Sequence, residues 1–219
     1  IRYLKELCEF SGIDCTLLPD YSDTLDGGSW SEYRKIPDGG TPVERIRDTA
    51  LSEGVIELGS GIKPEKSVAA HLGSEFAVPG RTMPIPVGID LTDGFLGTIR
   101  ELSGKNIHKR YMNERGRLVD AYIDAHKYLS GRRAVIYGET DLVSGLVSFL
   151  SEIGVTPVLC ATGANKNDLD PSAFERISDK GVVLSDDTDF ATMLEHAKSL
   201  SPDIVIGNSK GFRMSRSLG

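Results

Sequence analysis

One short segment has the residue types and spacing of an anion-binding turn. Gly207, Asn208, Ser209 and Gly211 follow a short apolar run directly and come just before the start of a helix. The first N–H groups of a helix have no partner inside it, and the helix dipole favours negative charge beside them. We therefore predict a cofactor-binding loop at these four residues, with its amides directed toward a cleft between two lobes. The alternative is a plain strand-to-helix turn in which Asn208 or Ser209 is the N-cap.

Other motifs lack the spacing that their chemistry would need, and no catalytic residue is predicted. The turn at 138–141 does not have the G-x-G-x-x-G spacing, and no Gly-Lys-Ser/Thr follows the glycines at 59–61, so 59–67 is interpreted as a connector. Asp120 and Asp124 lie one helical turn apart with His126 beside them, a pattern that could serve acid–base chemistry. An exposed polar stripe is the favoured interpretation of that pattern.

The cysteines and histidines do not predict a metal site. Cys8, Cys15 and Cys160 form no CxxC or Cys/His pattern with zinc spacing, and we expect the three thiols to lie on separate elements. This usage fits a reducing cytoplasm with buried thiols. The four histidines, which are also dispersed along the chain, are His71, His108, His126 and His196.

Composition excludes several classes of protein. The chain has 219 residues, 25 Lys plus Arg against 32 Asp plus Glu, and a net charge of -7. Nucleic-acid binding needs a concentrated basic patch, and the one basic stretch, 105–117, is expected to be a solvated helix face. Apolar runs fall far short of the roughly 18 residues that span a bilayer. We therefore expect no nucleic-acid partner and no membrane partner. Because the chain opens at Ile1, we also expect it to be a piece of a longer protein.

Apolar periodicity predicts the elements that position these residues. In the first part we expect a helix ended by Ser11-Gly12, a strand over 13–18, a long loop over 19–40, and a capping-box helix from Thr41 to about Leu51. Further strands are predicted at 54–58 and 84–87, and helices at 65–72 and 92–102. A long amphipathic helix is predicted over 106–129.

The remaining residues alternate strand and helix more cleanly. Strands are predicted at 133–137, 156–160, 181–184 and 203–206, with helices between them and after Ser209. Such alternation is typical of crossover units on a parallel sheet. The predicted fold class is therefore α/β, with two open, mostly parallel, Rossmann-like lobes joined by the long helix. The predicted boundaries are 1–130 for a middle lobe that ends in this helix and 131–219 for a truncated C-terminal lobe.

Several residue strings, in order along the chain, resemble the nitrogenase component 1 family. The most specific are 84–93 (PIPVGIDLTD), 114–120 (ERGRLVD) and 202–211 (PDIVIGNSKG), and the others are 12–26, 39–42, 101–104 and 137–141. The strings at 18–20, 114–120 and 207–209 resemble the β-type subunits, both the catalytic one and its cofactor-assembly counterpart. In α-type chains a cofactor-binding thiolate lies in the stretch that corresponds to 58–61, where this sequence has only glycine and serine.

The resemblance implies partners and cofactors for the whole assembly. The partners would be an α-type component 1 subunit and an ATP-driven iron protein, and the assembly would hold iron–sulfur or metal–sulfur clusters. In catalytic β-type chains the relay cluster is bound by cysteines that precede the region resembled here, so no cluster ligand is assigned to Cys8 or Cys15. The chain alone is expected to hold no cluster and to be inactive, with its long helix and the 19–40 loop packed on partner subunits.

Three functions stay open at this stage. The resemblance implies part of a β-type subunit in iron-protein-driven multi-electron reduction, as in nitrogen fixation or in a nitrogenase-like enzyme with another substrate. It also allows a scaffold on which the nitrogenase metal cofactor is assembled and then handed over. A third reading, unrelated to the resemblance, is a two-lobed α/β protein that binds a small molecule in its cleft.

Overall fold

The computed structural model describes residues 1–26, 32–33, 35, 39–165, 168–175, 177, 181–186 and 189–219. The described strands form two parallel sheets, one with two strands and one with four. The predicted α/β class with parallel sheets is confirmed. The lobe boundary near residue 130 stays a prediction.

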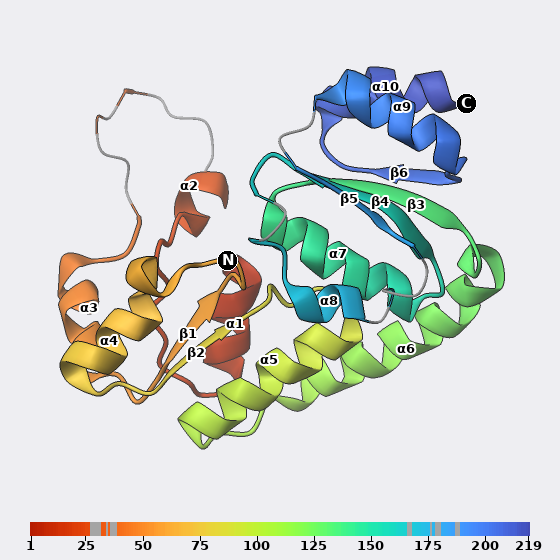
Figure 1. The fold of residues 1–219 in the computed structure, drawn as a ribbon. Helices are drawn as coiled ribbons and strands as arrows, with labels where there is room; N and C mark the ends of the chain where they lie inside the picture. Colours follow the sequence, from red (N-terminus) through yellow and green to blue (C-terminus); the bar gives the residue numbers. More distant parts are fainter. Residues whose placement is uncertain are drawn as a thin grey trace.

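The elements before residue 130 surround the two-stranded sheet (Figure 1). Strands β1 (Val55–Leu58) and β2 (Gly80–Met83) pair in parallel through the register Val55↔Gly80 to Leu58↔Met83. Their helices are α1 (Arg2–Phe10), α2 (Ser22–Asp26), α3 (Val43–Asp48), α4 (Val68–Phe76), α5 (Gly88–Ser103) and α6 (Lys109–Leu129). Short 3₁₀ turns lie at η1 (Thr49–Leu51) and η2 (Pro64–Lys66). Buried side chains of α1, α5 and α6 form one apolar cluster beside the sheet.

The elements after residue 130 form a sheet with the strand order β5-β4-β3-β6. The strands are β3 (Arg133–Gly138), β4 (Thr156–Thr162), β5 (Val183–Asp186) and β6 (Ile204–Ile206). Helices α7 (Thr140–Glu152) and α8 (Pro171–Glu175) cover one face, and α9 (Phe190–Leu200) and α10 (Phe212–Leu218) cover the other (Figure 1). A 3₁₀ turn, η5 (Ser209–Gly211), connects β6 to α10.

The apolar run of β3 explains why this sheet is buried on both faces. Ala134 and Ile136 belong to the cluster under α7, whereas Val135 and Tyr137 belong to the cluster under α9. Successive side chains of a strand point to opposite faces, so a strand covered on both sides needs apolar residues at every position. That requirement makes the run recognisable in the sequence.

Two predicted strands are wrong. Residues 13–18 pair with no described strand, and the second strand of the first sheet lies at Gly80–Met83 rather than at 84–87. Pro84 and Pro86 have no N–H to donate to a ladder. The apolar character of 84–87 comes instead from packing on α7, where the side chains of Ile85 and Val87 face Gly145.

Two predicted helix caps are also wrong. The Thr41 hydroxyl does not cap α3, because it donates to the Leu17 carbonyl at 2.5 Å and accepts from the Asp20 amide at 3.1 Å. Helix α5 begins at Gly88, four residues before the predicted cap Thr92, whose hydroxyl bonds the Pro86 carbonyl. Part of the predicted 19–40 loop lies outside the described residues. Among the described helices, none has the combination of length and apolar character that crossing a membrane requires.

Candidate functional site

The strand order identifies where a ligand would bind to the second sheet. Strand β3 has β4 on one side and β6 on the other, so the connections leaving β3 and β6 diverge at the carboxyl ends of these strands. Such a switch point is where open α/β sheets bind ligands. The turns that meet there are Gly138 to Thr140 after β3 and Gly207 to Gly211 after β6. The predicted loop therefore lies at the switch point of this sheet.

Two amides of the loop after β6 are hydrogen-bonded within the loop itself. The Asn208 side chain caps η5 by accepting from the Lys210 amide at 3.1 Å, and the Gly211 amide donates to the Asn208 carbonyl at 3.2 Å. Gly207, Asn208 and Ser209 are exposed, whereas Gly211 is buried. Asn208 is thus the N-cap that the turn alternative predicts, and the cofactor-binding role of the four residues stays a prediction.

Tyr137, at the end of β3, fills the space under this loop. Its hydroxyl donates to the Asn208 carbonyl at 2.5 Å, and its ring packs edge-on against Phe190 with centroids 5.5 Å apart. A Cβ atom placed on Gly207 would lie 2.2 Å from Tyr137 Cζ, and one on Gly211 would lie 2.1 Å from Tyr137 Oη. Both positions therefore require glycine because a tyrosine ring lies against the backbone.

The connector after β1 reaches the same end of the second sheet. The Gly61 amide donates to Asp141 Oδ1 at 3.4 Å, and a Cβ atom on Gly61 would lie 2.7 Å from the Asp168 carbonyl oxygen. The Ser60 hydroxyl is buried and has no hydrogen-bond partner in the described residues. Gly59 and Gly61 thus allow the connector to lie close to Asp141 and Asp168, which belong to the second part of the chain. Their spacing in the sequence did not reveal this role.

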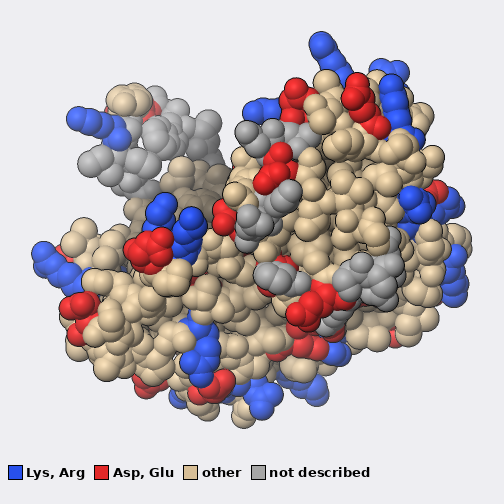
Figure 2. Space-filling view, in the orientation of Figure 1, with Lys and Arg blue, Asp and Glu red and all other residues tan. Residues whose placement is uncertain are grey.

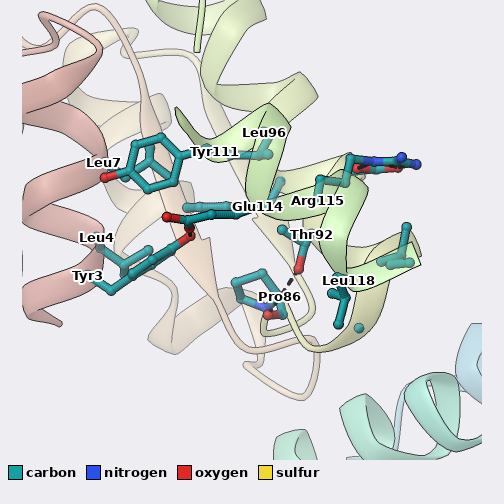
Figure 3. A pocket seen from close by; sticks show the side chains of 14 residues that line it. Tyr3, Leu4, Leu7, Pro86, Thr92, Leu96, Tyr111, Glu114, Arg115 and Leu118 are labelled. Carbon is teal, nitrogen blue, oxygen red and sulfur yellow. Dashed lines mark hydrogen bonds and ion pairs between the residues drawn. The ribbon is translucent and has the colours of Figure 1, made fainter. Parts of the chain in front are cut away.

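A groove lies between α1, α5 and α6 (Figure 3), with a volume of about 350 Å³. Its floor is apolar and includes Leu4, Leu7 and Leu96, and the buried Tyr111 packs edge-on against Tyr3 with centroids 5.5 Å apart. The hydroxyl of Tyr111 is buried without a partner in the described residues. Desolvation and the nearby Glu114 carboxylate raise the pKa of Tyr3 to about 12, and its hydroxyl donates to Glu114 at 3.2 Å.

Ion pairs at the edge of this groove join two of the family-like strings. Arg115, from 114–120, makes a forked contact with the Asp93 carboxylate, from 84–93, with nitrogen–oxygen distances of 2.6 and 2.7 Å. Arg110 pairs with Glu114 one turn away at 3.0 Å. The basic stretch is therefore partly paired rather than only solvated. On the face that Figure 2 shows, Lys and Arg are interspersed with Asp and Glu, and uncharged residues cover much of the surface between them.

The remaining candidate groups lie apart from these sites. Asp120 and Asp124 are exposed on α6, where Asp124 pairs with Lys127 at 3.1 Å. Within the described part of the chain, no group of three or more Cys, His, Asp or Glu side chains is placed to hold a metal ion. Cys8 lies on α1, Cys15 in the segment that follows it and Cys160 on β4, so the three thiols lie on separate parts of the chain as expected.

Sequence reasoning missed Glu152, at the end of α7. Its carboxylate accepts the Ile89 amide at 2.8 Å and the Asp90 amide at 3.2 Å, so a residue of the second part of the chain caps α5 in the first part. Gly88, with φ +82°, lies against the same carboxylate. A partner more than sixty residues away gives no local signal in the sequence. The only hint is that α5 begins at a glycine with no side-chain cap beside it, so its first amides need an acceptor from elsewhere.

Comparison with known proteins assigns these features to a family. The family description "Nitrogenase component 1 type Oxidoreductase" matches residues 1–219. The nitrogenase molybdenum-iron protein beta chain of Clostridium pasteurianum is 31% identical over 219 residues, covering 99% of this chain and 47% of that protein. The corresponding chain of Azotobacter vinelandii is 35% identical over 222 residues, covering 96% of this chain and 40% of that protein.

A solved structure shows the same fold. The structure titled "Nitrogenase Cp1 at pH 6.5" superposes with a TM-score of 0.88 at 30% identity, covering 99% of this chain and 47% of that chain. The chain therefore spans about half the length of the relatives that it matches. Since the match extends over every residue of the sequence, the chain belongs to the nitrogenase component 1 type oxidoreductase family.

Proposed function

We propose that this chain is part of a β-type subunit that pairs with an α-type component 1 subunit in iron-protein-driven multi-electron reduction. The observation that carries the proposal is the match over the entire chain to relatives named as nitrogenase beta chains. The paired strings 84–93 and 114–120 support it, because they build the groove between α1, α5 and α6 rather than a catalytic centre. The role assigned to these residues is to hold helices in place for partner subunits.

The cysteines of the chain do not fit an iron–sulfur cluster. A cluster of the common type needs four cysteine thiolates converging on one site. The chain has three. Cys160 lies in the core of the second sheet, Cys8 lies on α1, and Cys15 packs against the apolar cluster of α1. We propose that clusters of the assembly are held by other residues.

The test is reconstitution with partners. The protein that carries this chain is co-expressed with its α-type partner, and ATP-dependent oxidation of a reductant is measured after addition of the iron protein. We expect a stable complex with iron-protein-dependent turnover. Absence of a complex with the α-type subunit would refute the proposal. A complex that accepts no electrons but transfers a metal cofactor to another component 1 protein would favour the assembly scaffold.

The isolated chain provides a second test. After anaerobic incubation with iron and sulfide, we expect no stoichiometric cluster to survive gel filtration and no reductase activity. A cluster that persists, and that is lost on substitution of any of the three cysteines by alanine, would contradict the assignment of cluster binding to other residues.

A further inference from the structure

An imidazole caps the start of α6. The backbone amide of Arg110 donates to His108 Nδ1 at 3.3 Å, so the histidine side chain accepts one of the first N–H groups of the helix. The Tyr111 amide donates to the His108 carbonyl at 3.0 Å and completes the turn. Serine, threonine, asparagine and aspartate are the usual residues at this position, and their oxygens stay acceptors near neutral pH. A cap made by histidine depends instead on the protonation state of its ring.

The same histidine joins α6 to the end of α1. The His108 amide donates to Ser11 Oγ at 3.1 Å, and the His108 ring packs against Phe10 with centroids 5.7 Å apart. The Arg110 guanidinium lies over the same Phe10 ring, 5.4 Å from its centroid. The residue after Arg110 is Tyr111, whose side chain is buried and lines the groove between α1, α5 and α6. The cap therefore lies where α1, α6 and this groove meet.

The positive charges around His108 favour its neutral form. Lys105 and Lys109 are exposed on either side of it along the chain, and Arg110 shares the phenylalanine ring with it. The first turn of α6 contains no acidic residue. The N-terminal end of a helix also carries a partial positive charge from the helix dipole. A second proton on the imidazole would be repelled by all of these groups.

The carboxylates of α1 and α6 near this joint do not pair with His108. Glu114 accepts Arg110 Nε at 3.0 Å, and this hydrogen bond lowers the pKa of Glu114. On α1, the Glu6 carboxylate interacts with Arg110, and Glu9 is exposed. None of the ion pairs of the described residues includes His108. Imidazole is the side chain that ordinarily changes charge between about pH 5 and 8.

We propose that His108 is an acid-sensitive cap, which loosens the joint between α1 and α6 when its imidazole is protonated. A proton on Nδ1 removes the lone pair that accepts the Arg110 amide and leaves that N–H without its acceptor. The added charge lies beside Lys109 at the positive end of the α6 dipole, so repulsion acts in the same direction. The cap contributes fully at pH 8 and is lost as the pH falls toward 5. Nothing in this proposal depends on the subunit role proposed above.

The test is hydrogen exchange of the full-length protein that carries this chain, measured by mass spectrometry at pH 8 and pH 5. After correction for the pH dependence of the intrinsic exchange rate, we expect protection in peptides that cover 108–111 to fall about 5-fold at pH 5, the effect of losing a typical N-cap. Peptides from 116–124, in the middle of the same helix, should keep their protection. Unchanged protection at 108–111 would overturn the proposal, and so would an equal loss at 116–124, which would mean general acid destabilisation.

Three variants assign the effect to the imidazole. His108→Asn keeps a capping acceptor that does not titrate, so its protection at 108–111 should be the same at both pH values. His108→Lys has a positive charge and no acceptor, so it should show the low protection at both. His196→Asn, on the exposed side of α9, is the matched control and should keep the full pH response at 108–111.

Because His108 is exposed, these substitutions remove no core packing. A pH response at 108–111 that persists in His108→Asn would assign the change to another group and overturn the proposal. Full protection of His108→Lys at both pH values would overturn it as well, since the cap would then contribute nothing to the start of α6.

Discussion

At the scale of single residues, the Tyr137 ring determines which residues the loop after β6 can contain. Replacing Gly207 or Gly211 by alanine would place a methyl group about 2 Å from the tyrosine, and overpacking of this kind costs roughly 1–3 kcal/mol. We expect each variant to lower the urea midpoint of unfolding by that free energy. The matched control is Gly163→Ala, where a Cβ atom meets nothing within 4 Å.

A second substitution, at Tyr137, distinguishes the cause of the stability loss at Gly207 from that at Gly211. The atom nearest to a Cβ at position 211 is the Tyr137 hydroxyl at 2.1 Å, with Cζ at 2.5 Å, whereas the three nearest atoms at position 207 are all ring carbons. Tyr137→Phe should therefore restore part of the stability lost in Gly211→Ala and none of that lost in Gly207→Ala. Equal rescue of both variants would show that the loop shifts as a whole and that the ring does not select glycine.

Asp20 gives the chain a predictable pH dependence. Hydrogen bonds from Lys5 and Ser22 lower the pKa of Asp20 to about 2, and its side chain is 10% exposed. An unfolded aspartate has a pKa of about 3.9, so this carboxylate stabilises the fold above that pH and loses its contribution as pH falls toward 2. Asp20→Asn should cost about 1 kcal/mol at pH 7, because Lys5 is partly solvated, and clearly less at pH 3.

Unfolding in urea at the two pH values measures this difference. Asp120→Asn, on the exposed face of α6, is the control and should change the midpoint little at either pH. A cost of Asp20→Asn that is constant from pH 7 to pH 3 would contradict the charge-based explanation.

At the scale of elements, the start of α5 depends on a distant carboxylate. Glu152→Ala leaves the Ile89 and Asp90 amides without their acceptor, and loss of such a cap costs roughly 1–2 kcal/mol. We expect faster hydrogen exchange at the first turn of α5 and a lower melting temperature. Glu195→Ala, on the exposed side of α9, should change neither quantity. Unchanged exchange at residues 89–92 in Glu152→Ala would rule out the capping role.

The elements that could be predicted from the sequence share one property, a burial pattern that repeats along the element. Strands β3 and β4 are buried on both faces and therefore appear as apolar runs, and α6 shows its stripe over many turns. The first part of the chain was harder, because Thr41 bonds to Leu17 instead of capping α3 and because 84–87 is apolar for contact with α7. The candidate loop was located correctly at a strand end, but Tyr137 and Glu152 act through residues far away in sequence, which periodicity does not show.

At the scale of the whole molecule, the two sheets are held together by close packing of α5 and the 84–87 segment on α7. A Cβ atom on Gly145 would lie 3.2 Å from Ile85 and 3.3 Å from Val87. Gly145→Leu should therefore push the two sheets apart, increase the radius of gyration measured by small-angle scattering, and speed proteolysis between them. Gly94→Leu, where a Cβ atom meets nothing within 4 Å, should leave the radius unchanged. Equal radii for the two variants would mean that this contact does not hold the two sheets together.

Helix α6 also has a thermodynamic consequence. Its first turns contribute Tyr111 to the cluster beside the two-stranded sheet, and its last turns contribute Tyr122 and Leu129 to the cluster beside the four-stranded sheet (Figure 1). At 1.5 Å per residue its 21 residues extend for about 30 Å, long enough to reach both cores. Melting either core would strip one end of this helix of its packing, and short helices without packing are marginal in water. The two halves of the chain should consequently melt in one calorimetric transition rather than as two independent domains.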